Sequence, residues 1–311
     1  MRIAIVGAGG IGGGYGAALA KAGADVTFIA RGAHLAAMKS AGLKVLSPRG
    51  DIHLVPTQAT DNPADIGKVD IVLFCVKLWD VESAGERIKP LIGPGTAVIP
   101  LQNGIDAHER LLPILGSGAV MCGVAQISAS ITAPGTITQV GAFMRMVFGE
   151  LDGKRSQRAE DFLALCLKAG FEATLSEAIL TDLWMKFILL ASNAGMMALS
   201  RQPIGKLRDD PDMLPIFRAA YQEVADVGRA KGVKLPADAV ERILDATKHF
   251  PPAMKASMAL DLDRGNRLEV PWLSGKVAEL GRQFGIATPT HSMMHAMLKP
   301  YAMGTQNSTV P

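Results

Sequence analysis

The amino-acid sequence predicts an α/β protein, with an N-terminal Rossmann-type domain on a mainly parallel sheet and an all-helical C-terminal domain. Three observations predict this fold. Short β-branched runs alternate with helical patterns in the first half, a glycine-rich turn follows the first strand, and helical periodicity alone remains after about residue 178. A chain of 311 residues is long enough for two domains, and we place them at residues 1–177 and 178–311.

Four apolar runs predict the strands of the parallel sheet, at residues 2–9, 25–31, 69–77 and 96–104. Each is apolar enough to be buried on both faces. A helical pattern at 12–23 joins the first two runs into a βαβ unit. Three further runs, at 119–132, 135–140 and 144–150, predict shorter strands that extend the same sheet.

The rest of the chain is predicted to be helical, apart from a brief strand at 171–177 that follows a helix at 156–170. The helical domain opens with a long helix from Ala178 to Ser200, which Arg201-Gln202-Pro203 stops. Five more segments repeat apolar residues with a period near 3.6, at 213–232, 237–247, 254–263, 272–285 and 291–303.

Composition excludes several classes of protein. The net charge is +3 and the basic residues are scattered, so we expect no nucleic-acid partner. No uninterrupted apolar run reaches about 18 residues, and the chain begins with a strand, so we expect no membrane span and no signal peptide. Cys75, Cys122 and Cys166 lie far apart, which is typical of reduced thiols in a cytoplasmic protein.

The turn after the first strand carries the pattern GxGxxG, in Gly7-Ala8-Gly9-Gly10-Ile11-Gly12. Gly7 permits the tight turn, Gly9 lets a pyrophosphate approach the backbone, and Gly12 lets helix and strand pack closely. The helix that follows offers free N–H groups to phosphate. A strand before the motif and a helix after it favour a dinucleotide site over a merely glycine-rich turn.

The end of the second predicted strand indicates which dinucleotide binds. An NAD-binding protein usually has an acid there, to hold the ribose 2′-hydroxyl. Here Arg31 stands at that place, and Asp25 lies too early to serve. Arg31 could instead be a solvated residue at a strand end, but a guanidinium suits a 2′-phosphate, so we predict NADP(H) as the cofactor.

Two other strand ends carry polar residues. Lys77 closes one run, and Gln102-Asn103-Gly104 closes the next. Ligands of open α/β sheets bind at the carboxyl ends of strands, so Lys77 and Asn103 are candidate binding residues. Asn-Gly is also a common turn, and the pattern alone favours the binding role only slightly.

The long helix carries a lysine within an apolar run, in WMKFILLASNAG. Lys186 and Asn193 are seven residues apart and therefore lie on nearly the same face of the helix, with Leu190 between them. Two polar groups on an apolar helix suggest the wall of a cleft. A partly desolvated lysine has a lowered pKa, which suits a general acid. Taken alone, a lysine that reaches out to solvent explains the pattern equally well.

Two more features have competing explanations. The polar segment DRGNRLE follows Ser257 by a few residues and ends in Glu269, and by composition it reads as a charged helix end. His291 and His295 are spaced like helical metal ligands, but neither an acid nor a third histidine accompanies them. We therefore expect no metal site.

In combination, these motifs resemble the ketopantoate reductase (2-dehydropantoate 2-reductase) family, through about residues 3–295. GxGxxG, Lys77, Gln102-Asn103-Gly104, Trp184-x-Lys186, and Ser257 twelve residues before Glu269 occur in this order. The resemblance implies reduction of ketopantoate to pantoate with NADPH, on the route to pantothenate and coenzyme A. It also implies an active site between the two domains.

The resemblance assigns roles residue by residue. Lys186 matches the proton donor and also contacts substrate, and Glu269 matches the acid that positions the lysine and bound ligands, cofactor included. Asn103 matches a contact to the nicotinamide and to substrate. Ser257 matches a contact to the substrate carboxylate, whereas Lys77 and Arg31 match cofactor contacts.

The sequence departs from the family pattern at two places. Where that pattern has asparagines four and eight residues after the lysine, this chain has Leu190 and Ala194, and Asn193 is offset by one residue. We keep Asn193 as a substrate-binding candidate. A reductase of another 2-oxo acid and a non-catalytic NADP-binding redox sensor remain alternatives. The methionine-rich C-terminal helices could form a homodimer contact or a core.

Overall fold

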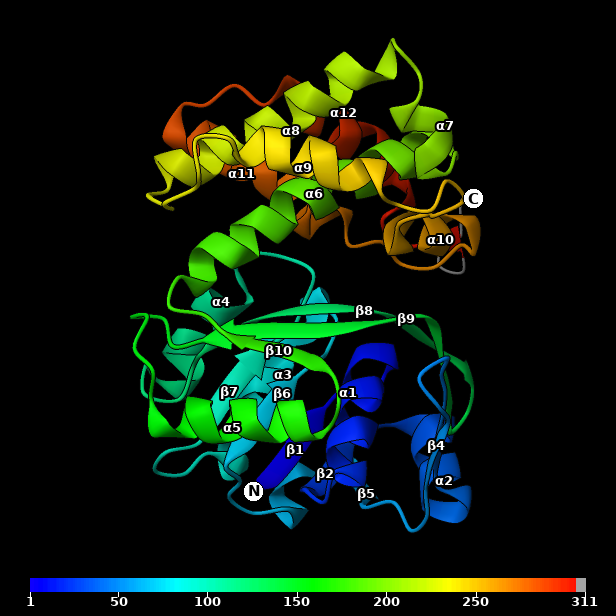
Figure 1. Ribbon diagram of the computed structural model, residues 1–311, viewed down its shortest axis with the longest axis vertical. Helices are drawn as coiled ribbons and strands as arrows, with labels where there is room; N and C mark the ends of the chain where they lie inside the picture. Colours follow the sequence, from blue (N-terminus) through cyan, green and yellow to red (C-terminus); the bar gives the residue numbers. More distant parts are fainter. Residues whose placement is uncertain (306–311) are drawn as a thin grey trace. The chain divides into compact units, whose positions relative to one another are not determined.

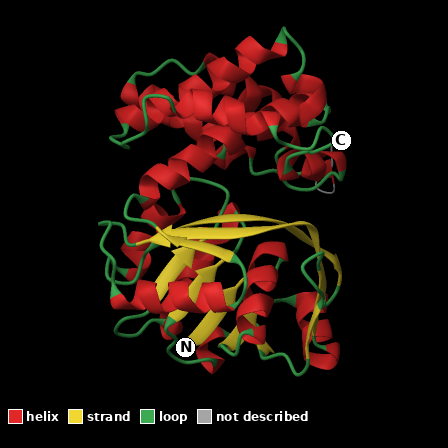
Figure 2. Cartoon of the chain, viewed as in Figure 1, coloured by secondary structure: helices red, strands yellow, loops and turns green. Residues whose placement is uncertain are grey.

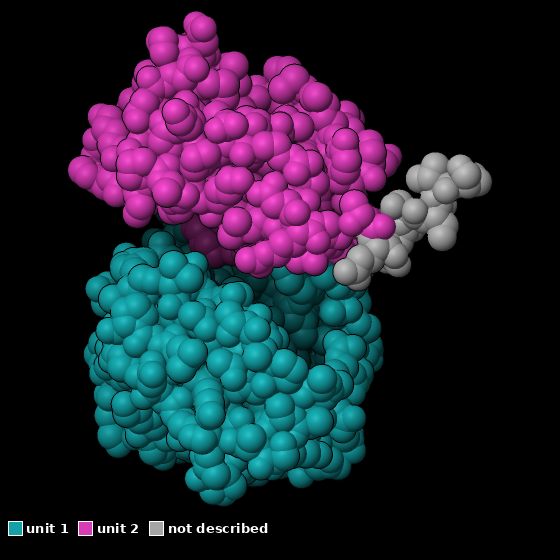
Figure 3. All heavy atoms as spheres, turned by 90° about the vertical axis from the view of Figure 1, so that its right-hand side faces the viewer, with its two compact units in different colours: residues 1–102, 106–182 teal, residues 103–105, 183–311 magenta. Residues whose placement is uncertain are grey.

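The computed structural model describes residues 1–305, which fall into two compact units (Figure 1 and Figure 3). Unit 1 comprises residues 1–102 and 106–182, and the described part of unit 2 comprises residues 103–105 and 183–305. The division lies a few residues beyond the predicted position of 177/178. Helix α6 (Ile179–Ser200) runs through it, and its first turn belongs to unit 1, where Asp182 accepts a hydrogen bond from Ser176 at 2.5 Å.

Unit 1 is built on a parallel sheet with strand order β5-β2-β1-β6-β7. The five strands are β1 (Arg2–Val6), β2 (Asp25–Ile29), β5 (Ala59–Thr60), β6 (Ile71–Phe74) and β7 (Ala97–Pro100). Helices of this unit are α1 (Gly10–Lys21), α2 (Gly32–Ala41), α3 (Val81–Arg87), α4 (Ala107–Leu115) and α5 (Gln157–Lys168), with short 3₁₀ turns at Pro63–Asp65, Leu78–Asp80 and Lys89–Leu91. The parallel Rossmann-type sheet predicted from the sequence is confirmed.

The prediction for residues 119–150 was wrong in one respect, because these residues form a separate sheet instead of extending the first. Strands β8 (Cys122–Ala133) and β9 (Thr136–Gly149) make one long antiparallel hairpin. The hairpin joins β3 (Leu43–Leu46), β4 (Ile52–Leu54) and β10 (Glu172–Leu175) in a sheet of order β10-β9-β3-β4, with β8 on β9. Strand β9 contains two runs that were predicted as separate strands, 135–140 and 144–150. Between them the consecutive residues Val-Gly-Ala-Phe at 140–143, which are exposed in the structure, break the alternation of polar and apolar residues.

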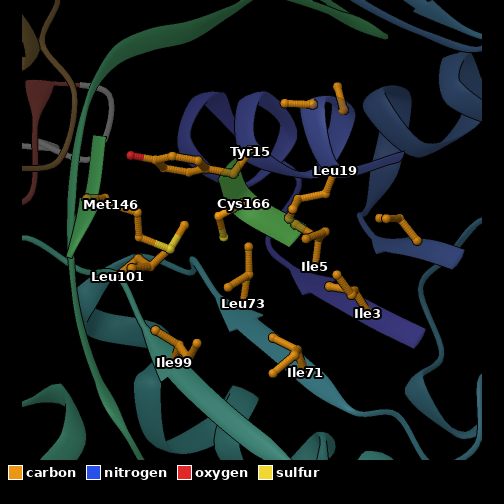
Figure 4. Close-up of a cluster of buried hydrophobic side chains, with 14 of the residues drawn as sticks. Ile3, Ile5, Tyr15, Leu19, Ile71, Leu73, Ile99, Leu101, Met146 and Cys166 are labelled. Carbon is orange, nitrogen blue, oxygen red and sulfur yellow. The ribbon is translucent and has the colours of Figure 1, made fainter. Parts of the chain in front are cut away.

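The core of unit 1 lies on both faces of the parallel sheet, because alternate residues of each strand point to opposite sides. One face of β1 places Ile3 and Ile5 in a cluster with Tyr15 and Leu19 of α1 and with Met146 of β9 (Figure 4). The other face contributes to a second cluster, which includes residues of α3 and α4. This burial on both sides explains why the strands read as continuous apolar runs.

Unit 2 is helical in its described part (Figure 2). Besides α6 it contains α7 (Ile204–Arg208), α8 (Met213–Ala230), α9 (Ala239–Lys248), α10 (Ser257–Asp263), α11 (Ser274–Phe284) and α12 (Pro289–Leu298), with 3₁₀ turns at Val270–Trp272 and Lys299–Tyr301. Glycines let two helices approach α6 closely. A Cβ on Gly228 of α8 would lie 2.7 Å from the Trp184 ring, and one on Gly195 would lie 2.3 Å from the sulfur of Met294 in α12.

Helix α6 is long and apolar enough to satisfy a test for a membrane span by length and composition. Its most apolar window is 67% buried inside the protein, however, which is typical of a core helix in a globular protein. The apolar face carries Trp184, Phe187, Ile188 and Ala191, each at most 2% exposed. The helix therefore serves as the central element of unit 2, and Lys186 lies within it.

Candidate functional site

The glycine-rich turn of unit 1 begins where β1 ends and is shaped by close backbone contacts. Gly7 has a φ of +94°, a conformation that favours glycine, and a Cβ there would lie 2.9 Å from the carbonyl of Cys75 at the end of β6. A Cβ on Gly12 would lie 2.2 Å from the Gly7 carbonyl oxygen and 2.8 Å from Ile5. By contrast, nothing lies within 4 Å of a Cβ on Gly9. Gly7 and Gly12 are thus required by the fold, whereas Gly9 leaves space open.

A pocket of about 180 Å³ lies beside this turn, at the carboxyl ends of β1 and β2. Its lining includes Gly7, Ala8, Gly9 and Arg31 from the predicted site, together with apolar residues such as Pro63 and Ile88. Gly10, Ile11 and Gly12 form the first turn of α1, whose N–H groups lack carbonyl partners within the helix. An apolar pocket that adjoins a helix N-terminus and contains a guanidinium suits the adenosine and phosphate groups of a dinucleotide. The residues present therefore fit the predicted cofactor.

Charged groups cluster at the Arg31 side of this pocket. Arg31 forms an ion pair of 3.8 Å with Asp80, and Arg87 of α3 also lines the pocket while it donates to the carbonyl of Asp61 at 2.6 Å. Lys77 lies exposed after β6, with its ammonium 5.6 Å from the centre of the Trp79 ring. A 2′-phosphate would find two guanidinium groups here, one of which the sequence analysis did not identify.

Unit 2 contains the second cluster of predicted residues, which centres on Lys186. The Lys186 ammonium donates a hydrogen bond to Oδ1 of Asn103 at 3.0 Å. Burial lowers the pKa of Lys186 from 10.5 to about 8, although the negative charge of Glu269 acts in the opposite direction. Glu269 is itself only 8% exposed. The structure thus brings together Lys186, Asn103 and Glu269, which are far apart in the sequence, and Lys186 does not extend freely into solvent.

The other two predicted substrate residues lie in different surroundings. Asn193 is 4% exposed, and its Oδ1 accepts a hydrogen bond of 2.5 Å from the hydroxyl of Tyr221 in α8. Ser257 is exposed at the first position of α10. A substrate role for either residue stays a prediction.

Some polar residues near these clusters were not among the predicted site residues. Gln102 is 6% exposed and donates from Nε2 to the carbonyls of Phe74 and Val76, which ties the end of β7 to that of β6. His34 of α2 and Arg87 of α3 line the dinucleotide pocket. For His34 and Arg87, the signal that could have identified them is their position in helices that follow strands β2 and β6.

The two histidines of α12 have no metal-site geometry. His291 is fully buried, with Nε2 3.1 Å from the Ala220 carbonyl and 3.3 Å from the Ser192 hydroxyl, and burial lowers its pKa to about 4. Among residues 1–305, no three histidine, cysteine or acidic side chains come together in a way that could hold a metal ion. His291 therefore reads as a neutral residue of the core.

A pocket in unit 1 that fits a dinucleotide and a lysine in unit 2 with a lowered pKa are each typical of dinucleotide-dependent oxidoreductases. The family model "Ketopantoate reductase PanE/ApbA" matches residues 3–153, and the model of its C-terminal part matches residues 178–302. The chain belongs to the ketopantoate reductase family, as its motifs suggested, and is an NADP(H)-dependent enzyme and not a non-catalytic sensor.

Individual relatives agree with this assignment. The 2-dehydropantoate 2-reductase of Mesorhizobium japonicum is 30% identical and is covered over 98% of its length by 97% of this chain. The crystal structure of 2-dehydropantoate 2-reductase from Geobacter metallireducens is 30% identical with a TM-score of 0.89, over 96% of this chain and 99% of that one. A D-mandelate dehydrogenase bound to NADH and anilino(oxo)acetate has a TM-score of 0.88 over 97% of this chain and 98% of its own, but its 19% identity indicates a shared fold alone.

Proposed function

We propose that this protein reduces 2-dehydropantoate (ketopantoate) to pantoate with NADPH, and that Lys186 supplies the proton. The observation that carries the proposal is the environment of Lys186. Its ammonium is desolvated, is hydrogen-bonded to Asn103 and lies near a buried carboxylate. The family assignment supports the reaction class, since relatives that match almost the whole chain bear the name of this reductase.

The pKa of Lys186 suits the step assigned to it. With a pKa of about 8 the side chain is mostly protonated at neutral pH, yet it gives up a proton more readily than an ordinary lysine. As an ammonium it polarises the carbonyl oxygen of the substrate and then protonates the alkoxide. A positive charge held where negative charge develops lowers the barrier, by about 3–4 kcal/mol for one donor in comparable sites.

Asn103 and Glu269 keep the lysine ready for this step. Because Asn103 accepts one of the three ammonium N–H groups, the other two remain to bind substrate. The carboxylate of Glu269 offsets part of the desolvation and so favours the charged form of the lysine.

The dinucleotide would be held by the glycine turn of unit 1, with Arg31 at its 2′-phosphate. Bound NADPH supplies the hydride for the carbonyl carbon. The first turn of α1 provides backbone N–H donors for the pyrophosphate, and Gly9 leaves room for it. Lys77 stays a predicted cofactor contact.

The test is NADPH oxidation with ketopantoate for the wild type, Lys186→Met and the matched surface control Lys248→Met. Lys248 is 70% exposed and pairs with Asp245. We expect turnover in the wild type and in the control, with a loss of about 10²–10⁴-fold in Lys186→Met. If Lys186→Met retained wild-type turnover, the proposed role of the lysine would be wrong.

One observation favours a second candidate, the reduction of a more apolar 2-oxo acid. Leu190 and Ala194 follow Lys186 by one and two turns, and neither can hydrogen-bond a substrate hydroxyl through its side chain. The matched substrate is trimethylpyruvate, which is ketopantoate without its hydroxyl. If the site forms a hydrogen bond with the hydroxyl of ketopantoate, kcat/KM for trimethylpyruvate should be about 10⁴-fold lower than for ketopantoate. In an apolar site the two values should differ by no more than about 10²-fold.

Two further expectations belong to the proposal. The three cysteines form no disulfide, which supports a reducing, cytoplasmic setting. A homodimer stays a prediction: Met293 and Met297 are exposed on α12, whereas Met294 is buried in the core. Sedimentation of the purified protein would establish its oligomeric state.

A further inference from the structure

His34 of α2 joins two segments of unit 1 that are far apart in the sequence. Its Nε2 lies 2.9 Å from the carbonyl oxygen of Ala8, in the glycine turn, and its Nδ1 accepts the backbone N–H of Gly135 at 3.0 Å. A carbonyl oxygen can only accept and a backbone N–H can only donate. These partners assign the donor role to Nε2 and the acceptor role to Nδ1.

The segment on the other side of His34 is the tip of the long β8–β9 hairpin. Gly135 sits at this tip with a φ of +73°, and its carbonyl accepts the N–H of Lys44 at 2.9 Å. A Cβ on Gly135 would lie 3.0 Å from the side chain of Ala37 in α2, so the tip packs closely on this helix. Ile131, near the same tip, lines the dinucleotide pocket together with His34.

The contact to Ala8 fixes a peptide group that the cofactor needs. In a trans peptide the C=O and the following N–H point in opposite directions, so holding the carbonyl of Ala8 also sets the direction of the Gly9 N–H. Gly9 would otherwise turn at little cost, because it lacks a Cβ and has open space around it. The N–H groups of Gly7 and Ala8 are already used, since both donate to the carbonyl of Ile29.

We propose that His34 is a positioning residue for the dinucleotide, which locks the Ala8–Gly9 peptide of the phosphate-binding turn to the tip of the β8–β9 hairpin. This inference rests on the proposed binding of NADPH by unit 1, but not on the substrate. Since the pyrophosphate is common to NADPH and NADH, loss of His34 weakens the binding of both dinucleotides alike. Loss of Arg31 differs, because it affects the 2′-phosphate of NADPH alone.

The experiment compares three histidine variants by their dissociation constants for NADPH and NADH, measured by the fluorescence of the bound nicotinamide. His34→Leu removes both hydrogen bonds, whereas His34→Gln keeps one donor and one acceptor. His53→Leu is the matched control, because Nε2 of His53 also contacts a backbone carbonyl, that of Ala41 at 2.8 Å, but His53 does not line the pocket. Melting temperatures are recorded for all three.

We expect His34→Leu to weaken binding of both dinucleotides about tenfold, the effect of one lost hydrogen bond that also frees the peptide. His34→Gln should recover most of the affinity, and His53→Leu should bind as the wild type does. If His34→Leu lowered the melting temperature but bound both dinucleotides normally, His34 would be merely structural and the inference wrong.

Hydrogen exchange on the wild-type protein provides a measurement that does not depend on the folding of any variant. NADPH should slow exchange of the Gly135 amide, because this amide donates to Nδ1 of His34 while Nε2 of the same ring contacts the Ala8 carbonyl in the turn. If NADPH slowed exchange in the glycine turn but left exchange at Gly135 unchanged, the inference would be wrong and the proposed function would remain intact. A wild type that binds neither dinucleotide would overturn both.

Discussion

The pH dependence of the wild-type rate tests the role proposed for Lys186 as the acid. Reduction requires the ammonium form, and burial brings the pKa of Lys186 down to about 8. The value of kcat/KM, which reports the free enzyme, should therefore be nearly level around pH 7 and fall tenfold per pH unit well above pH 8, to about 1% at pH 10. An ordinary lysine would give no such fall below pH 10. A rate that stayed level to pH 10 would refute the assignment of Lys186 as the acid.

Removing the charge of Glu269 should shift the alkaline decrease in rate to lower pH. The carboxylate raises the pKa of Lys186 against the effect of burial, so Glu269→Gln should lower that pKa further. The alkaline fall in rate would then begin below pH 8. Glu279→Gln is the control, because Glu279 is a half-exposed residue of α11 that pairs with Lys276. If both variants had the pH–rate profile of the wild type, Glu269 would not influence the pKa of the lysine.

The same lysine should reduce the stability of the fold. A folded-state pKa of about 8 against 10.5 in the unfolded chain corresponds to about 3 kcal/mol of unfavourable free energy at neutral pH. The unfolded state binds more protons between these two values, so stability of the wild type should rise as the pH increases from 8 to 10.5. Lys186→Met should accordingly unfold at higher denaturant concentration at pH 7, with a smaller gain near pH 10, even though activity is lost.

Further variants test the dinucleotide pocket and the core of unit 2. Arg31→Ala should weaken NADPH binding by about 1.5–3 kcal/mol and leave NADH binding unchanged, as titration with each would show. Gly9→Ala should keep its melting temperature but lose dinucleotide binding, whereas Gly12→Ala should lose stability by about 1–3 kcal/mol because its Cβ meets the Gly7 carbonyl. The lowered pKa of His291 predicts full stability above about pH 6.5 and a loss of up to about 3 kcal/mol as the pH falls toward 4. Denaturant titrations at several pH values would measure this loss. The loss should be smaller in His291→Gln.

The sequence predicted the parallel sheet and the glycine turn because both depend on local pattern and steric necessity. Burial on two faces makes residues 3–6 of β1 apolar, and the contacts of Gly7 and Gly12 admit no larger side chain. The separate β8–β9 sheet could not be predicted in the same way. It is held by pairing between residues far apart, such as Lys44 with Thr136, and such pairing is invisible to periodicity.

Lys186 could be singled out from the sequence, whereas His34 could not. Lys186 was conspicuous because a charge in an apolar run needs an explanation, and its neighbours Asn103 and Glu269 were found through family motifs. His34 carries an equally specific pair of hydrogen bonds, but its partners are backbone groups. Backbone partners impose no sequence pattern, so contacts of this kind become apparent only in the folded chain.

Asn193 shows where an inference from helical spacing needs an experiment. Spacing placed it on the Lys186 face as a substrate residue, whereas its Oδ1 accepts a hydrogen bond from the buried hydroxyl of Tyr221. Tyr221→Phe would leave that oxygen without this donor and should cost about 1–3 kcal/mol of stability. If Asn193 serves the fold, KM and kcat for ketopantoate should stay unchanged in Tyr221→Phe. If Asn193 binds substrate, its released amide should alter KM, and the contrast between stability and KM separates the two roles.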